Sequence, residues 1–315
     1  MPRILASLVA LCLLLVGSLS VSAQDATPAA GGSVAITGPE GSGSATVTIS
    51  DFVDPFVDYD PSYRPLHGYH FVMASISVEN TGQLPFMIYP TDFQLVDTEG
   101  FTYYATQVSR IDQGSVGDFA GSNGMSAGDQ ISGALFFMVL NDAPVQSLIY
   151  SGVDRLTTIA SISKLEAPAI GEPVTIIDYD GTDWAEVTIT GLKDPFESFD
   201  PSYAPERGQH YVLINITITN VGPRPLSIDP YAFYLVDADG FAYNPANLYF
   251  PADSPLQILQ YADGLETGQS VEGVLGFQVF NDVEVTEVIF RPLGDRLITV
   301  ADATSATSPA ATPEA

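Results

Sequence analysis

The sequence predicts an all-β protein that consists of two tandem antiparallel β-sandwich domains behind a signal peptide. Three observations predict it: an apolar N-terminal run, an internal repeat, and apolar side chains that alternate with polar ones. The chain has 315 residues, of which 46% are hydrophobic. This length suits one large or two ordinary domains, and the apolar fraction is too high for a disordered chain.

The N-terminus has the features of a secretory signal peptide. Arg3 supplies a positive start, residues 4–16 are apolar, and Val-Ser-Ala at residues 21–23 fits the small-x-small cleavage pattern. The apolar run is shorter than the roughly 20 residues that a membrane-spanning helix needs. We therefore expect cleavage after residue 23, a secreted protein, and no transmembrane segment after processing. Retention of residues 1–23 as an anchor is the alternative.

The composition excludes several classes of protein. The chain has 38 Asp and Glu residues against 10 Lys and Arg residues, a formal net charge of −28, and its basic residues do not cluster. This balance argues against nucleic acid as a partner. The single cysteine, Cys12, lies in the apolar N-terminal run, so a disulfide framework and a Cys-based zinc site are excluded. The hydrophobic core must therefore supply the stability of the mature protein.

An internal repeat shows that a whole domain is duplicated. A shift of 140 residues places Asp-Pro-Phe at 54–56 on 194–196, and Asp-Pro-Ser-Tyr at 60–63 on 200–203. Solenoid repeats run at about 20–50 residues, so this period indicates duplicated domains. The register continues with Gly100-Phe101 on Gly240-Phe241 and Asn141-Asp142 on Asn281-Asp282, and after one inserted residue with Asp154-Arg155-Leu156 on Asp295-Arg296-Leu297.

The domain boundaries follow from this repeat and from two low-complexity ends. Neither end could bury enough apolar surface to offset its ordering entropy. We assign residues 1–23 to the signal peptide, 24–33 to a flexible segment, 34–162 to the first domain, 163–172 to the linker, 173–301 to the second domain, and 302–315 to a disordered tail.

The strands are predicted by period-two alternation. In residues 133–139 and 273–279 the two copies agree at every second position, as one buried strand face requires. Gly-containing turns separate the strands, and residues 97–100 and 237–240 fit hairpin turns better than EF-hand loops, because the distal Glu is missing. The clearest alternating apolar positions are Val72, Ala74, Ile76, Val78, Val212, Ile214, Ile216 and Ile218.

Each copy resembles the domain-of-unknown-function family 4352. The matching segments are 78–82, 92–100 with Tyr103, Gly128 and 133–137 in the first copy, and 219–222, 233–240 with Tyr243, Gly268 and 273–277 in the second. The resemblance implies a telokin-like, immunoglobulin-type sandwich, similar to the immunoprotective extracellular antigens, with an unassigned, non-enzymatic role. The chain departs from the family in lacking a usable lipoprotein cysteine and in its long segment 106–127.

Few residues offer catalytic chemistry. General acid–base and nucleophilic catalysis need a positioned base, most often His, and the chain has three His residues. His70 and His210 occupy matching positions at a strand entrance. We favour strand-end residues that hydrogen-bond a loop over metal ligands or bases. The nucleophile elbow, phosphate loop and His-Glu-x-x-His motifs are absent, so we expect no enzyme and no organic cofactor. A hydrolase that uses paired carboxylates is the least favoured interpretation.

Two acidic loops provide the alternative function. Clustered carboxylates on a turn-rich loop can bind Ca²⁺, whereas Asp before Pro or Ser is also common turn chemistry. The candidate metal ligands are Asp54, Asp58, Asp60, Asp194, Glu197 and Asp200.

Tyrosines near the same loops predict a contact surface. Tyr is enriched at recognition surfaces because it combines a large apolar area with a polar tip. The candidate surface residues are Tyr63, His70, Tyr203 and His210. We therefore expect a secreted, non-catalytic binding module at the cell surface or in the medium, with a protein or cell-envelope ligand that the sequence does not identify. A calcium-binding extracellular module is the alternative.

Overall fold

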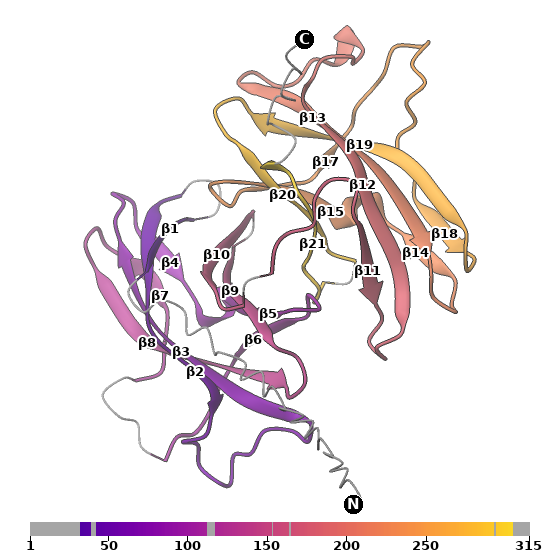
Figure 1. Ribbon diagram of the computed structural model, residues 1–315. Coiled ribbons are helices and arrows are strands. Elements are labelled where there is room, and N and C mark those ends of the chain that lie inside the picture. Colours follow the sequence, from indigo (N-terminus) through magenta and orange to yellow (C-terminus); the bar gives the residue numbers. More distant parts are fainter. Residues whose placement is uncertain are drawn as a thin grey trace, which may run out of the picture.

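Two β lobes lie side by side in the computed structural model, the N-terminal lobe in indigo to magenta and the C-terminal lobe in salmon to yellow (Figure 1). The structure describes residues 32–38, 42–111, 117–152, 154–163, 165–292 and 294–304. The predicted signal peptide, residues 1–23, lies outside the described residues. Among the described residues the helices are single 3₁₀ turns, and no helix there has the length and hydropathy to cross a membrane.

The described residues of the first domain form ten strands and one short turn of helix. They are β1 Ser33–Thr37, β2 Ser44–Phe56, β3 Tyr69–Asn80, β4 Phe86–Ile88, η2 Pro90–Asp92, β5 Phe93–Asp97, β6 Thr102–Thr106, β7 Ser122–Met125, β8 Gln130–Leu140, β9 Val145–Gly152 and β10 Arg155–Ser161.

The elements of the second domain repeat this order with two differences among the described residues: an additional turn, η3, and two short strands at the place of β6. They are β11 Pro173–Ile177, β12 Asp183–Phe196, η3 Pro201–Tyr203, β13 Gln209–Asn220, β14 Leu226–Ile228, η4 Pro230–Ala232, β15 Phe233–Asp237, β16 Ala242–Tyr243, β17 Pro245–Ala246, β18 Ala262–Leu265, β19 Ser270–Phe280, β20 Val285–Phe290 and β21 Ile298–Asp302.

Each domain is an antiparallel sandwich of a large and a small sheet. The large sheets have the orders β1-β2-β3-β8 and β11-β12-β13-β19-β17, and the small sheets are β6-β5-β9-β10 and β16-β15-β20-β21. Their facing sides enclose one apolar core per domain. The predicted alternation is confirmed, since the eight apolar positions of β3 and β13 are all at most 2% exposed. The all-β, two-sandwich prediction is therefore confirmed.

One strand differs between the copies. β6 pairs with β5 and, at its end, with β8, so the two sheets of the first domain are continuous. In the second domain the same stretch is divided into β16 and β17 at Asn244. Pro245 follows the break, and proline has no N–H to donate to a strand ladder.

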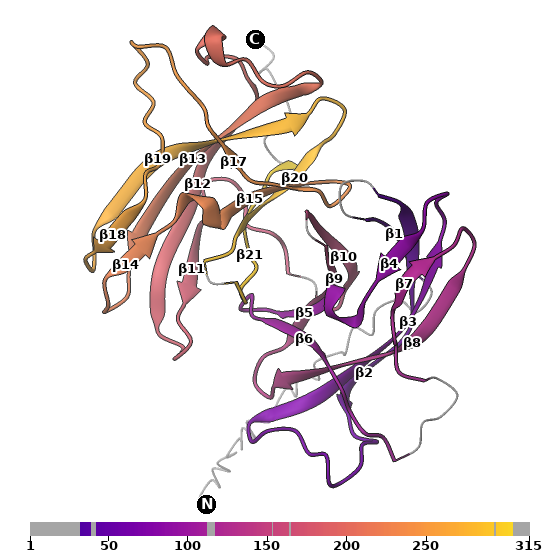
Figure 2. The same cartoon turned by 180° about the vertical axis from the view of Figure 1, so that it is seen from behind.

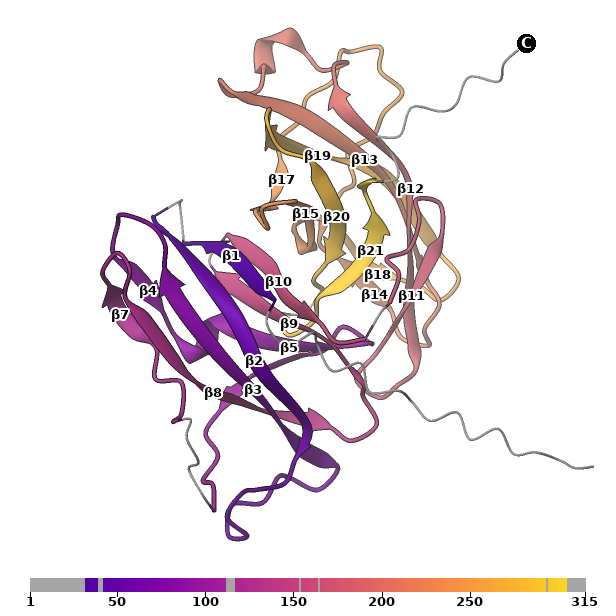
Figure 3. The ribbon, with the colours of Figure 1, turned by 60° about the vertical axis from the view of Figure 1, so that its left-hand side comes forward.

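The two domains contact each other through their small sheets. Figure 2 shows β5, β9 and β10 next to β21, and Figure 3 shows β5 and β9 between the large sheet of the first domain and the second domain. Side chains from both sheets form a shared apolar cluster, which excludes water from this contact. Its buried members are Val96, Ile149, Val236, Ala242, Ile289 and Leu297.

Candidate functional site

Each domain holds a histidine between an aspartate and an asparagine. In the first domain, Nε2 of His70 donates a hydrogen bond to Oδ1 of Asp54 at 2.8 Å, and Nδ1 lies 3.3 Å from Oδ1 of Asn141. The register of β2 on β3 shifts between Val53 and Phe56. Such a bulge redirects a side chain, and here it places Asp54 beside a histidine 16 residues later in the chain.

The second domain repeats this arrangement. Nε2 of His210 lies 2.7 Å from Oδ1 of Asp194, and Nδ1 lies 3.2 Å from Oδ1 of Asn281. The Asp54–Pro55 and Asp194–Pro195 peptide bonds are cis. Both copies have the same arrangement. In each, a histidine at the start of the central strand, β3 or β13, contacts the bulge of one neighbouring strand, β2 or β12, and the end of the other, β8 or β19. Each histidine thus has one partner in a strand bulge and one in the turn that follows β8 or β19.

The electrostatics of this arrangement favour a charged ring in the first domain. The hydrogen bond to Asp54 raises the pKa of His70 above its ordinary value; burial opposes this shift, and the Asn141 contact adds to it. Oxygen atoms lie within hydrogen-bonding distance of both ring nitrogens, so both nitrogens can donate when the ring is protonated. A ring engaged in this way at both nitrogens is poorly suited to act as a general base.

The Asp-Pro-Ser-Tyr loops are tight turns closed by their aspartates. Oδ1 of Asp60 accepts hydrogen bonds from the backbone N–H of Ser62 at 2.8 Å and from its hydroxyl at 2.7 Å. In the second domain Asp200 accepts from the backbone N–H of Ser202 at 2.8 Å. The hydroxyl and backbone bonds from Ser62 lower the pKa of Asp60. The loops therefore use the aspartate side chain to bond the backbone two residues on.

These turns present exposed tyrosine rings. Tyr63 is 42% exposed and its ring centroid lies 6.5 Å from that of Phe71. Tyr203 is 47% exposed and stacks on Tyr249 with a centroid separation of 4.0 Å. Stacking and the turn limit the motion of each ring, so both domains offer a preformed aromatic contact.

The structure does not bring the predicted surface residues together on one face. Successive strand residues point to opposite sides of a sheet. His70 therefore lies on the core side of β3, whereas Phe71, on which Tyr63 stacks, lies on the opposite side of the sheet in a second buried cluster. In the second domain Tyr211 likewise carries its hydroxyl to the backbone oxygen of Tyr203 at 3.2 Å. The tyrosines therefore belong to an outer surface, and the histidines to the end of the sandwich.

The candidate calcium ligands have other partners. Asp54 and Asp194 bind histidines, and Asp60 and Asp200 bind the backbone of their own turns. Within the part of the chain that the structure describes, no three Asp, Glu, His or Cys side chains are grouped so that they could hold a metal ion. A calcium site that also recruits Asp58 and Glu197 stays a prediction.

Residues 97–100 and 237–240 form the predicted hairpin turns. Oδ1 of the buried Asp97 accepts the backbone N–H groups of Glu99 and Phe101, both at 2.9 Å, and Oδ2 accepts the Tyr103 hydroxyl at 2.7 Å. Asp237 makes the same three bonds in the second domain. Desolvation raises the pKa of Asp97, although these hydrogen bonds oppose the shift.

The tips of these turns lie in the domain interface, and no sequence pattern predicted this contact. The backbone N–H of Leu297 donates to the oxygen of Gly100 at 2.7 Å, and that of Leu156 donates to the oxygen of Gly240 at 2.8 Å. Each domain thus gives its Gly turn to the Asp-Arg-Leu segment of the other. The Gly turn and the Asp-Arg-Leu segment both match between the two copies, so the sequence marked them as shared features. This match did not show that the Gly turn of one domain contacts the Asp-Arg-Leu segment of the other.

Two immunoglobulin-like β-sandwiches in tandem define the class of this protein. Each has an exposed tyrosine turn and a histidine clamp, which consists of Asp54, His70 and Asn141 in the first domain and of Asp194, His210 and Asn281 in the second. The chain belongs to the family described as "Domain of unknown function (DUF4352)", which matches residues 39–157 and 170–295. The family resemblance of both copies is therefore confirmed. No curated protein matches the chain.

Solved structures of low sequence identity match one domain's length of the chain. The ycdA protein of Bacillus subtilis is 20% identical over 44% of this chain and 40% of that one, with a TM-score of 0.32. MPT63, a secreted protein from Mycobacterium tuberculosis, is 18% identical over 43% of this chain and 95% of that one, with a TM-score of 0.33. The yjhA protein of Bacillus subtilis is 19% identical over 41% and 84% of the respective chains, with a TM-score of 0.31. This chain therefore spans less than half of the ycdA chain.

Proposed function

We propose that the protein is a secreted, non-catalytic binding module that acts at the cell surface or in the medium. The N-terminal sequence pattern supports export, and one structure of similar fold is described as that of a secreted protein. The engaged histidines support a role without acid–base catalysis. Because the described residues group no three metal-ligating side chains, calcium is not part of this proposal.

The observation that carries the proposal is the exposed ring at the same turn of both domains. Tyr63 and Tyr203 stay outside although each has an aromatic neighbour to stack on. A large ring that is already held in place loses little conformational entropy on binding, which is why tyrosine is effective at recognition surfaces. The ligand is a protein or another component of the cell envelope, and the net charge of −28 disfavours anionic surfaces.

A surface-association experiment tests this proposal. The processed protein is incubated with envelopes of the producing organism, and the bound fraction is compared with that of the double variant Tyr63→Ala, Tyr203→Ala. We expect saturable binding that weakens at least tenfold in the double variant, as loss of central aromatic contacts predicts. The control is Tyr231→Ala, which removes a tyrosine that is 61% exposed and belongs to η4 rather than to these turns. Absence of envelope binding, or equal binding by the double variant, would contradict the proposal.

A further inference from the structure

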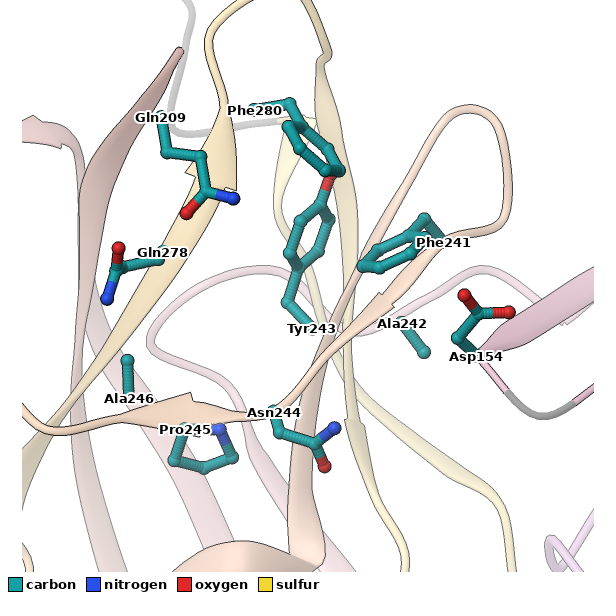
Figure 4. A pocket seen from close by; sticks show the side chains of 10 residues that line it. All are labelled: Asp154, Gln209, Phe241, Ala242, Tyr243, Asn244, Pro245, Ala246, Gln278 and Phe280. Atoms are coloured by element: carbon teal, nitrogen blue, oxygen red, sulfur yellow. The ribbon is translucent and has the colours of Figure 1, made fainter. Parts of the chain in front are cut away.

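A pocket of about 280 Å³ opens in the second domain, beside the first (Figure 4). It lies where β16 and β17 cross from the small sheet to the large one. This volume is at the lower end of the range for small-molecule sites, so it suits one ring-sized unit. The lining residues are Asp154, Gln209, Phe241, Ala242, Tyr243, Asn244, Pro245, Ala246, Gln278 and Phe280.

One side of the pocket is aromatic. The ring centroid of Phe241 lies 4.6 Å from that of Tyr243 and 5.7 Å from that of Phe280, and the planes of both pairs are steeply inclined. Figure 4 shows these three rings together, with Phe280 above and Phe241 toward the first domain. Phe280 is 43% exposed although it is a large apolar residue. This cluster offers an apolar surface to the C–H face of a ligand ring.

The remaining polar groups are uncharged amides. Gln209, Gln278 and Asn244 each carry a side-chain amide, which both donates and accepts hydrogen bonds. The backbone N–H of Glu206 donates to Oε1 of Gln278 at 3.0 Å, which orients that amide. Hydroxyl groups also donate and accept, so this set complements a polyhydroxylated ring.

The charges beside the pocket form a pair of opposite sign. Asp154, which the first domain contributes, is the charged residue among the described lining residues, and Nε of Arg155 lies 3.9 Å from its Oδ1. The guanidinium carbon of Arg155 also lies 4.7 Å from the ring centroid of Phe241. Because opposite charges adjoin the pocket, a neutral ligand is favoured over an anion or a cation. The net charge of −28 disfavours anions further.

The first domain shows that the fold does not require these amides. The positions that correspond to Gln209, Asn244 and Gln278 are occupied there by Tyr69, Tyr104 and Met138. The register is the same, since β3 pairs with β8 as β13 pairs with β19. The three amides are therefore particular to the second copy, as residues selected for a ligand would be.

The corresponding region of the first domain also has an internal partner. The ring of Phe101, which corresponds to Phe241, lies 5.6 Å from that of Tyr179. The hydroxyl of Tyr179 donates to Asp295, the counterpart of Asp154, at 2.7 Å. Tyr179 thus contacts both Phe101 and Asp295. The corresponding residues beside the pocket, Phe241 and Asp154, offer a ligand the same kind of contact.

We propose that this pocket binds a neutral saccharide unit, packed on Phe241, Tyr243 and Phe280 and hydrogen-bonded by Gln209, Asn244 and Gln278. Neither Tyr63 nor Tyr203 lines the pocket, so the variants that test this proposal differ from those that test the proposed envelope contact.

Saturation-transfer NMR on the processed full chain tests the proposal. The probes are glucose, galactose, mannose, arabinose, N-acetylglucosamine and maltose. We expect saturation of ring protons from at least one probe, with millimolar affinity. The double variant Asn244→Tyr, Gln278→Met introduces the residues that the first copy carries in the same fold, so it should remain folded, which circular dichroism checks. Its affinity should fall at least tenfold.

The matched control is Tyr104→Asn, which makes a comparable change at the corresponding position of the first domain and should leave saccharide binding unchanged. No saturation from any probe, or equal saturation in the double variant, would overturn the proposal. Binding of triglycine with the same dependence on Asn244 and Gln278 would also overturn it, because the site would then recognise peptide amides.

Discussion

The guanidinium carbon of Arg296, in the second domain, lies 4.0 Å from the ring centroid of Phe101, in the first. Its Nη2 group donates to the backbone oxygen of Glu99 at 2.9 Å, and its Nη1 group donates to that of Ile177 at 2.8 Å. The residue is only 2% exposed. One arginine thus connects a turn of the first domain to β11 of its own domain at the centre of the interface.

The opposite contact is related but weaker. The guanidinium carbon of Arg155, in the first domain, lies 4.7 Å from the ring centroid of Phe241, in the second. The duplicated domains therefore place the same pair of residue types on both sides of one interface, as in an isologous dimer. Arg296 also donates hydrogen bonds to the backbone oxygens of Ile177 and Glu99. The contributions of the two arginines to stability should therefore differ.

Replacing Arg296 should destabilise the protein more than replacing Arg155. Arg296→Ala removes two charge-assisted hydrogen bonds and a desolvated cation–π contact, so we expect the free energy of unfolding to fall by roughly 2–4 kcal/mol. Arg155→Ala removes a cation–π contact and should lower it by about 1 kcal/mol. Guanidinium chloride denaturation of both variants measures the difference, and equal losses would contradict the assigned role of Arg296.

Gly100 should tolerate alanine less than Gly128 does. Both have positive φ, at +84° and +81°, so both substitutions carry a backbone cost of about 1–2 kcal/mol. At Gly100 the added Cβ would also lie 2.6 Å from Cγ1 of Ile298 and 2.8 Å from the oxygen of Leu297, whereas at Gly128 it meets no atom within 4 Å. We expect Gly100→Ala to lower the Tm by several degrees more than Gly128→Ala, and to separate the domains in small-angle scattering. Equal Tm values for the two variants would contradict the prediction, because they would show that the interface adjusts to the added Cβ atom at residue 100.

The clamp of the first domain should stabilise the protein more in acid than in base. The pKa of His70 is raised in the folded state by its bond to Asp54. The stabilisation is therefore complete below the unfolded pKa of about 6.5 and is lost as the pH rises through the folded value. The difference in unfolding free energy between wild type and His70→Gln should decrease between pH 5 and pH 9. The control variant is His67→Gln, at an exposed position. A difference that increases with pH would refute the assignment.

Glu287→Gln should stabilise the protein at neutral pH. Desolvation raises the pKa of Glu287, with a further contribution from Asp302, its neighbour across β20 and β21. The charged form is therefore disfavoured in the folded state, and this penalty grows as the pH rises through the folded pKa. We expect a Tm above wild type by a few degrees at pH 7 and equal to it at pH 3. Glu284→Gln, at an exposed position, is the matched control, and an unchanged Tm at pH 7 would contradict the prediction.

The strands and their buried faces were predictable because they depend on a local pattern. Val72 and Ile76 are buried as their alternation requires. The pattern did not predict that the other face of β5 is buried as well. Gln94 and Val96 are 3% and 5% exposed, because the small sheet of the second domain covers the side that a lone sandwich would leave in water.

The candidate site was predictable in its residues but not in its arrangement. The repeat identified His70, Tyr63 and the acidic loop as a set. Whether they converge depended on the β2 bulge, which turns Asp54 to His70, and on the turn that Asp60 closes, which leaves Tyr63 exposed. The saccharide pocket had no sequence signal, because it combines β16 and β17 with a residue from another domain.

Composition, the repeat and the alternation of side chains were sufficient to establish an acidic chain of two β-sandwiches, because the burial of one strand face depends on neighbours a few residues apart. The pairing of the domains and the pocket beside their junction depended on contacts such as that between Glu99 and Arg296, which are 197 residues apart. Such contacts follow from the shapes of two folded surfaces, and these shapes exist only after each sandwich has formed.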